Sequence, residues 1–175
     1  VIIMTKVYSF VALLAFSSFS FAGNTTFLPE AKISADSAKT WNVGAGITQE
    51  LLHLNGEWVN PYGIAYVKAG AFLNGDHEVG GQTGFRYPYH LTGKDKNGYY
   101  IGAYAGHLES KWVDGEEKAR LGAGIDLAYV LLSPERISSF SVGIGAGEKL
   151  EDRQGRVIEE TEPRIQFSYT LSMGL

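Results

Sequence analysis

The chain contains no cysteine among its 175 residues, and this absence excludes several classes of protein. Without cysteine there is no disulfide scaffold, no thiol nucleophile and no thiolate metal site. The chain also lacks a basic run, and its formal net charge of −4 gives no indication of nucleic-acid binding. After residue 22 there is no apolar run of the ~20 residues that a membrane helix needs. The fold must therefore be held by a cooperative hydrogen-bonded architecture.

The one long apolar stretch lies at the start of the chain. Lys6 precedes apolar residues 7–22, which end in Ser20-Phe21-Ala22. A positive residue, an apolar segment and small residues before the cut are typical of a secretory signal peptide. A transmembrane helix is the alternative, but the serines within the stretch favour the signal peptide. We expect residues 1–22 to be this signal, with translation starting at Met4, and residues 23–175 to form a single domain.

The last twelve residues alternate between apolar and polar or small side chains. The residues of the apolar face are Ile165, Phe167, Tyr169, Leu171, Met173 and Leu175. A period of two predicts a strand with one apolar face and one polar face. A strand of this kind at the end of a chain is typical of the closing strand of a transmembrane β-barrel.

Six further segments show strand-like patterns, separated by clusters of Gly, Asn, Asp, Lys and Glu. These segments are residues 41–51, 62–73, 79–89, 98–109, 119–131 and 140–147. Single-chain bacterial barrels have an even number of strands, so seven segments leave one strand to be found. If the chain ends on the inner side of the membrane, residues 53–61 form an inner turn and the strand at 41–51 runs inward. The eighth strand is then expected within residues 27–38.

The face opposite the apolar stripe distinguishes a membrane barrel from a water-soluble one. In a soluble barrel the apolar face forms the core and the outside carries charges. Here the second face is mostly Gly, Ser and Thr, as at Gly143, Gly145 and Gly147. Glycine weakens an ordinary strand, but small residues suit the narrow interior of an eight-stranded barrel. The sequence therefore predicts an all-β fold, an eight-stranded antiparallel up-and-down transmembrane β-barrel.

A few isolated charges fall on the small-residue face and are expected to point into the lumen. They are Glu50, Lys68, Arg86, Arg120, Asp126 and Arg164. Burying a charge without a partner costs several kcal/mol, so we expect a structural ion-pair network that plugs the barrel. A proton or ion path is the alternative. Aromatic residues near the predicted strand ends suit interfacial girdles, and they are Trp41, Trp58, Tyr62, Tyr89, Tyr99, Trp112 and Tyr129.

Several of these segments resemble a known group of proteins. The runs Phe85-Arg86-Tyr87-Pro88-Tyr89 and Gly98-Tyr99-Tyr100-Ile101-Gly102-Ala103-Tyr104-Ala105-Gly106 are similar to those of an uncharacterised small-barrel family. Over residues 42–175 the chain resembles the small outer-membrane β-barrel proteins of Gram-negative bacteria, which include the OmpA-like and OmpW-like barrels. The resemblance implies the architecture and no activity. The chain ends in Leu175, where such barrels usually end in Phe.

Enzymes on small outer-membrane barrels, such as lipid A deacylases and palmitoyl transferases, need a His with a Ser near the outer leaflet. His107 is the one candidate, because His107-Leu108-Glu109-Ser110 approaches an outer loop. At period two, His107 and Ser110 lie on opposite faces, and a Ser–His hydrogen bond of ~2.6–3.2 Å would require a bulge. The acidic residues of 148–162 do not have the spacing of a calcium loop. We therefore predict no catalytic residue, no cofactor site and no metal site.

These observations predict a non-enzymatic protein of the bacterial outer membrane with a structural or surface-interaction role in the envelope. Its expected partners are outer-membrane lipid, lipopolysaccharide and the barrel-assembly machinery, with no cofactor and no nucleic acid. Two alternatives stay open. One is a lipid A-modifying acyl hydrolase or acyltransferase that uses His107. The other is a soluble periplasmic lipocalin-like binder of a small apolar ligand.

Overall fold

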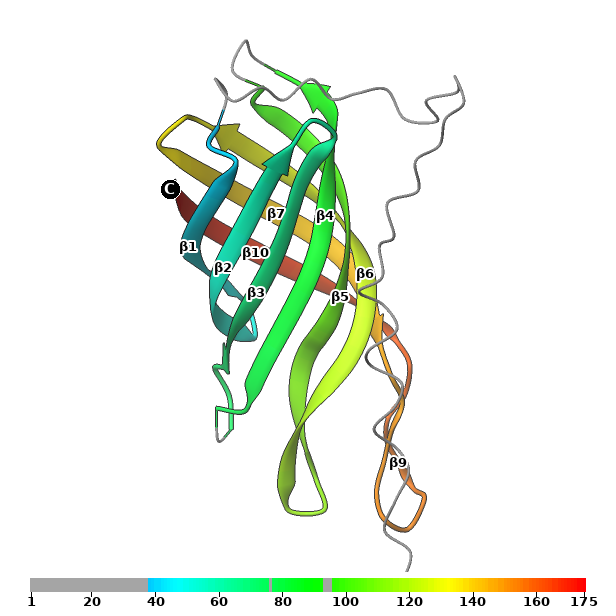
Figure 1. Ribbon diagram of the computed structural model, residues 1–175. Coiled ribbons are helices and arrows are strands. Elements are labelled where there is room, and N and C mark those ends of the chain that lie inside the picture. Colours follow the sequence, from blue (N-terminus) through cyan, green and yellow to red (C-terminus); the bar gives the residue numbers. More distant parts are fainter. Residues whose placement is uncertain (1–37, 76, 93–95) are drawn as a thin grey trace, which may run out of the picture.

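The computed structural model describes residues 38–75, 77–92 and 96–175. This part of the chain is all-β, and eight of its ten strands form one closed barrel (Figure 1). The barrel strands are β1 (Trp41–Thr48), β2 (Leu51–Asn60), β3 (Gly63–Phe72), β4 (Val79–Leu91), β5 (Gly98–Val113), β6 (Glu116–Leu132), β7 (Arg136–Gly147) and β10 (Pro163–Gly174). The predicted signal peptide lies outside the described residues.

Each strand of the barrel runs antiparallel to its neighbours, and from β1 to β7 the order around the barrel follows the order in the chain. β10 follows β7 around the barrel and pairs with β1 to close it, from Asn42 opposite Gly174 to Thr48 opposite Ser168. The remaining strands, β8 (Leu150–Glu151) and β9 (Val157–Glu159), form a small hairpin between β7 and β10. The prediction of an eight-stranded antiparallel up-and-down barrel is confirmed.

The position of the eighth strand was predicted wrongly. Residues 53–61 were expected to be a turn, but they belong mostly to β2, and the barrel closes without residues 27–37. The composition of β2 explains the error, because His53, Asn55 and Glu57 are polar but face the lumen, where all three are buried. Only Gln49 and Glu50 separate β1 from β2, without the Gly or Pro that usually marks a turn. As a consequence, β1 runs in the direction opposite to the predicted one.

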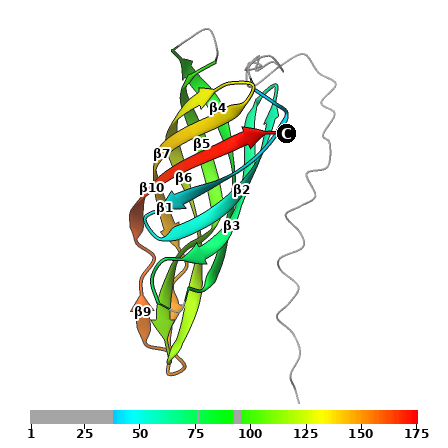
Figure 2. The same ribbon diagram turned by 90° about the vertical axis from the view of Figure 1, so that its left-hand side faces the viewer.

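The barrel has two different ends. The C-terminal end carries Gly174 and the short connections before β3, β5 and β7. The hairpin end carries the other connections, and there the β5–β6 and β8–β9 hairpins project beyond the rim (Figures 1 and 2). β5 and β6 are 16 and 17 residues long, so only Asp114-Gly115 separates them. Both turn residues have positive φ, +55° and +81°, as a tight hairpin turn requires.

The two faces of the barrel wall differ sharply in polarity. The outward face is apolar, with Leu54 71%, Ile125 60% and Phe140 51% exposed. The lumen holds buried polar and charged side chains, among them Lys68 and Arg86. This distribution is the reverse of a water-soluble barrel, whose apolar face forms the core.

The lumen is not polar throughout, because an apolar part lies toward the C-terminal end. A cluster of buried residues lies there, formed by Ala38, Val59, Ile64, Tyr100, Ala128, Val130, Leu132 and Ile137. This cluster was not predicted from the sequence, although Tyr129-Val130-Leu131-Leu132 is apolar on both faces and so indicates an apolar lumen there. None of the described residues forms a helix of the length and apolar character that crossing a membrane requires.

Candidate functional site in the barrel lumen

Arg86 and Asp126 form an ion pair in the middle of the lumen. Nη2 of Arg86 lies 2.9 Å from Oδ2 of Asp126, and both side chains are almost fully buried. The same guanidinium donates hydrogen bonds to the hydroxyls of Ser139 and Ser141 on β7, at 3.0 and 3.1 Å. β5 separates the two charged residues, and its Gly102 lies beside both. A Cβ at Gly102 would overlap the Asp126 carboxylate, so this glycine allows the pair to form.

Lys68 is the third buried charge of this central region. Its Nζ donates a hydrogen bond of 2.9 Å to the Ser168 hydroxyl and lies 5.0 Å from the centre of the Tyr66 ring. Arg86 lies over the same ring at 4.8 Å. In the described part of the chain, no ion pair includes Lys68. Ring and hydroxyl contacts therefore replace a carboxylate partner.

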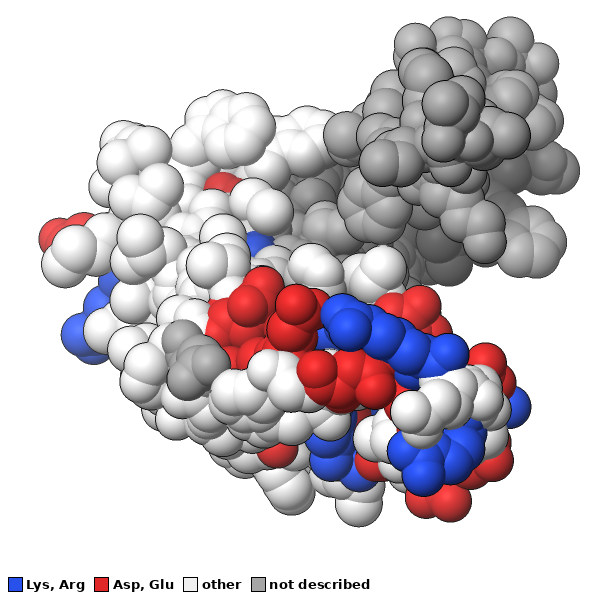
Figure 3. Space-filling model, turned by 90° about the horizontal axis from the view of Figure 1, so that it is seen from below, with Lys and Arg blue, Asp and Glu red and all other residues white. Residues whose placement is uncertain are grey.

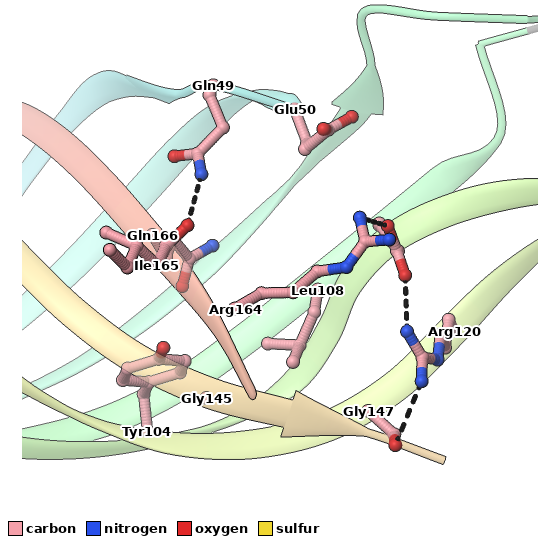
Figure 4. A pocket seen from close by; sticks show the side chains of 11 residues that line it. Gln49, Glu50, Tyr104, Leu108, Arg120, Gly145, Gly147, Arg164, Ile165 and Gln166 are labelled. Carbon is pink, nitrogen blue, oxygen red and sulfur yellow. Dashed lines mark hydrogen bonds and ion pairs between the residues drawn. The ribbon is translucent and has the colours of Figure 1, made fainter. Parts of the chain in front are cut away.

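A second charge cluster lies at the hairpin end of the lumen and is centred on Glu109. Its Oε1 lies 2.6 Å from Nη1 of Arg120, and its Oε2 lies 2.5 Å from Nη1 of Arg164 (Figure 4). Arg164 also pairs with Glu159 at 2.5 Å, and Arg120 donates to the carbonyls of residues 147, 148 and 160. Arg120 is buried, whereas the Arg164 side chain is 45% exposed. This cluster joins the rim of the barrel to the segment that carries β8 and β9.

A bulge in β5 places Glu109 in the lumen. The pairing of β5 with β6 shifts between His107 and Glu109, so Leu108 is the extra residue. Strict alternation along β5 puts His107 and Glu109 together on the outer face. For this reason Glu109 was not predicted from the sequence as a lumen residue. The lone Leu108 between polar neighbours was the only local sign of the bulge.

The six charges predicted to line the lumen therefore fall into four groups. Arg86 and Asp126 contact each other. Arg120 and Arg164 do not pair with each other, but both pair with Glu109 and with Glu159. Lys68 is buried and hydrogen-bonded outside any ion pair. Glu50 lies in the turn between β1 and β2, half-buried at the rim. The polar lumen residues absent from the prediction include His53, Asn55, Glu57, Gln82 and Glu109.

Several buried polar atoms of the lumen have no hydrogen-bond partner among the described residues. They are Oδ1 of Asn42, both ring nitrogens of His53, Oδ1 of Asn55, Oε2 of Glu57, the hydroxyl of Tyr104 and Oδ1 of Asp126. Buried polar groups in folded proteins are nearly always paired with protein or with ordered water. The lumen therefore requires hydration along its polar side.

Two small cavities lie in the lumen. The larger, of about 40 Å³, is at the hairpin end, and the deeper one, of about 10 Å³, is beside Lys68 and Asp126. One water needs about 10–15 Å³ on this measure, so the two cavities hold about three waters and about one. Binding pockets for organic ligands are many times larger.

His107 lies outside this arrangement. Its Nδ1 accepts a hydrogen bond of 3.1 Å from the backbone N–H of Gly81 on β4. The Ser110 hydroxyl donates to Glu117 instead of to the imidazole. Within the described ranges, no group of three or more His, Asp or Glu side chains is placed to hold a metal ion.

No protein-family model, no curated protein and no solved structure matches the chain. The class to which the described residues belong is therefore defined by the structure alone. It is a closed eight-stranded antiparallel β-barrel with an apolar outer face and a lumen filled by charged, polar and aromatic side chains.

Proposed function

We propose that this chain is a non-enzymatic outer-membrane β-barrel protein of a Gram-negative bacterium. The observation that carries the proposal is the apolar outer face of a barrel whose charges lie inside. Large apolar patches are rare on soluble monomers, whereas an outward apolar band is what bilayer hydrocarbon requires of a barrel. A closed barrel also satisfies all of its backbone hydrogen bonds between strands, as a lipid environment demands.

Aromatic residues at one end of the barrel support this proposal. Trp41 and Trp58 stack with ring centroids 6.0 Å apart, and Tyr99 meets Tyr129 edge to face at 5.1 Å. All four lie at or near strand ends at the C-terminal end and are exposed on the outer face. Amphipathic rings of this kind settle at the interface between lipid and water. Outer-membrane barrels have short periplasmic turns and longer loops at the cell surface, so we assign the C-terminal end to the periplasm and the end with the projecting hairpins to the cell surface.

The contents of the lumen favour a structural role over the two alternatives. Cavities of about 40 and 10 Å³ among charged side chains do not suit the apolar ligand of a lipocalin-like binder. At the rim, the Ser110 hydroxyl and the His107 ring are bonded to other groups, so neither activates the other. The structural network centred on Arg86, Asp126 and Glu109 is the role that these contacts support.

The hairpin end is the surface available for contacts outside the membrane. Charges of both signs gather there (Figure 3). Ion pairs join many of them, including Lys149 to Glu151 at 2.9 Å and Arg156 to Asp152 at 2.7 Å. Arg153 is joined to Asp114 of the other hairpin, so the two hairpins contact each other. We propose that this surface contacts lipopolysaccharide and that the barrel-assembly machinery inserts the chain.

Heat-modifiability of the protein in isolated membranes tests the proposal. We expect the protein in the outer-membrane fraction, with a gel mobility that shifts when the sample is boiled. A protein found in the soluble periplasmic fraction, with no shift, would contradict it. The mass of lipid A from cells with and without the gene provides a second measurement. A changed acyl pattern would favour the alternative, a lipid A-modifying enzyme that uses His107.

A further inference from the structure

The two cavities of the lumen lie one behind the other. The larger is bordered by Glu50, Arg120 and Arg164 at the rim of the hairpin end. The smaller is bordered by Lys68 and Asp126 in the middle of the barrel. Tyr104 and Gln166 line both cavities, so they form the boundary between them.

Glycines of β6 and β7 make room for the Tyr104 ring. A Cβ at Gly124 would lie 2.5 Å from the phenol oxygen, and one at Gly145 would lie 2.7 Å from it. A Cβ at Gly143 would lie 3.1 Å from the edge of the ring. A larger residue at any of these positions would push the ring out of its place. The phenol therefore lies across the lumen against a surface of glycines, beside Gly145 in Figure 4.

The deeper cavity is lined by groups that still have hydrogen-bonding capacity. The Tyr104 hydroxyl and Oδ1 of Asp126 are buried and have no partner among the described residues. The Lys68 ammonium has three donors and donates one hydrogen bond, to Ser168. A water molecule can accept from Lys68 or Tyr104 and donate to Asp126, and the cavity has room for about one.

Toward the C-terminal end the lumen is filled by closely packed side chains. Val130 and Ile137 of the apolar cluster are 0% and 1% exposed, and the polar Asn42 and Ser172 at the same end are 1% and 0% exposed. A solute that passes the deeper cavity must displace these packed side chains, which costs free energy.

We propose that the hairpin half of the lumen is a blind pocket, open to the outside, for water and for polar solutes about as small as three water molecules. Tyr104 divides this pocket into an outer chamber and an inner chamber at Lys68 and Asp126. The inference goes beyond the proposed function and rests on it only for naming the hairpin end as the outside.

Cysteine accessibility tests the pocket, because the chain has no cysteine of its own. Single cysteines are placed as Gln166→Cys at the boundary, Ser141→Cys in the inner chamber and Val130→Cys in the apolar cluster. Each is combined with Tyr104→Ala, which removes the ring, and with Tyr104→Phe as the matched control that keeps it. The probe is Ag⁺, a thiol-binding ion comparable in size to a water molecule, added to one side of reconstituted vesicles, and the thiols left free are measured after unfolding. The gel shift on boiling verifies that each variant is folded.

From the hairpin side, we expect Gln166→Cys to react in every background. We expect Ser141→Cys to react about tenfold faster with Tyr104→Ala than with Tyr104→Phe, which corresponds to a barrier lower by about 1.4 kcal/mol. Val130→Cys should stay unmodified in both. From the C-terminal side, no position should react.

Two results would overturn the proposal. Equal rates for Ser141→Cys in the two backgrounds would show that Tyr104 divides nothing, and reaction from the C-terminal side would show that the pocket is not blind. If Tyr104→Ala does not fold, the reaction rates of Gln166→Cys and Ser141→Cys are compared in the protein with the native Tyr104. Similar rates there would contradict the proposal that Tyr104 separates the two chambers. Failure of the proposed function would appear separately, as a soluble protein without a gel shift.

Discussion

Single residues determine whether charges can be tolerated inside this barrel. Arg86 reaches Asp126 over Gly102, and the hydroxyls of Ser139 and Ser141 each accept a further hydrogen bond from its guanidinium. A buried charge that loses its partner keeps its desolvation cost, which is larger than the net gain from forming the pair. The stability of the central lumen therefore depends on both members being present.

We expect Asp126→Asn to lower the free energy of unfolding by about 3–5 kcal/mol, because Arg86 then stays buried without a counter-charge. Arg86→Gln should cost a similar amount. The double variant should lose less than the sum, with a coupling of about 0.5–3 kcal/mol. Urea titration of the protein in lipid vesicles measures all three. The matched control is the exposed pair of Lys149 with Glu151, where Lys149→Gln and Glu151→Gln should each cost much less. Additive losses in the lumen would contradict the prediction.

At the scale of strands and hairpins, the period of two in β6 explains most of what this element does. Ile125, Leu127 and Tyr129 face outward, and Asp126 and Ala128 face the lumen. This alternation is a local property of an extended chain, so the sequence was sufficient to predict it. The bulge at Leu108 was not predictable in this way, since it depends on where β5 meets β6.

We expect Ile125→Arg to prevent normal insertion of the barrel. The side chain is 60% exposed on the outer face, and an arginine in the bilayer midplane costs about 2–4 kcal/mol. The fraction of protein that shows the gel shift measures the effect. Glu116→Arg is the matched control, because this position lies on the same strand but in the projecting hairpin. If Ile125→Arg assembled like the control, this face would not contact lipid.

The β8–β9 hairpin should depend on pH through Asp152. Its carboxylate accepts hydrogen bonds from the backbone N–H of Arg156 and Gln154 and from Nε of Arg156. These bonds, first that from the Arg156 backbone, lower the pKa of Asp152 below its ordinary value. A carboxyl with a lowered pKa stabilises the fold fully above its unfolded pKa, about 3.9, and stops doing so as the pH falls through the folded value.

We therefore expect the hairpin to be ordered at neutral pH and to lose protection below about pH 4. Hydrogen exchange at the Gln154 and Arg156 amides measures this loss. Asp152→Asn keeps an acceptor oxygen but cannot titrate, so its exchange should not change over the same range. A hairpin equally protected at low pH in the unmodified protein would contradict this assignment.

At the scale of the whole molecule, closure depends on two segments that are far apart in the chain. β1 has hydrogen-bonded partners on both sides only because β10 returns to it, with Ile47 opposite Tyr169. An unclosed barrel leaves the edges of both strands unpaired, which a bilayer does not tolerate. The barrel should therefore assemble completely or not at all.

Removing the last five residues, 171–175, should abolish the heat-modifiable form. The truncation takes away the partners of Asn42, Val43, Gly44 and Ala45 and so opens the barrel. The control is removal of five residues from the β8–β9 hairpin, 152–156, which lies outside the barrel wall. We expect that variant to keep its gel shift. A truncated protein that still shifts would mean that β10 does not close the barrel.

The sequence by itself determined which side chains share a face, that the structure is all-β, and that the lumen holds small residues and charges. These are properties of residues two positions apart, and an extended chain expresses them wherever it is placed. Only the tertiary structure decided that β2 supplies the strand missing from the seven predicted segments. It also decided that Glu109 joins Arg120 to Arg164 and that an apolar cluster lies toward the C-terminal end. Each of these depends on contacts between residues on different strands, and a local pattern contains no information about which strands meet.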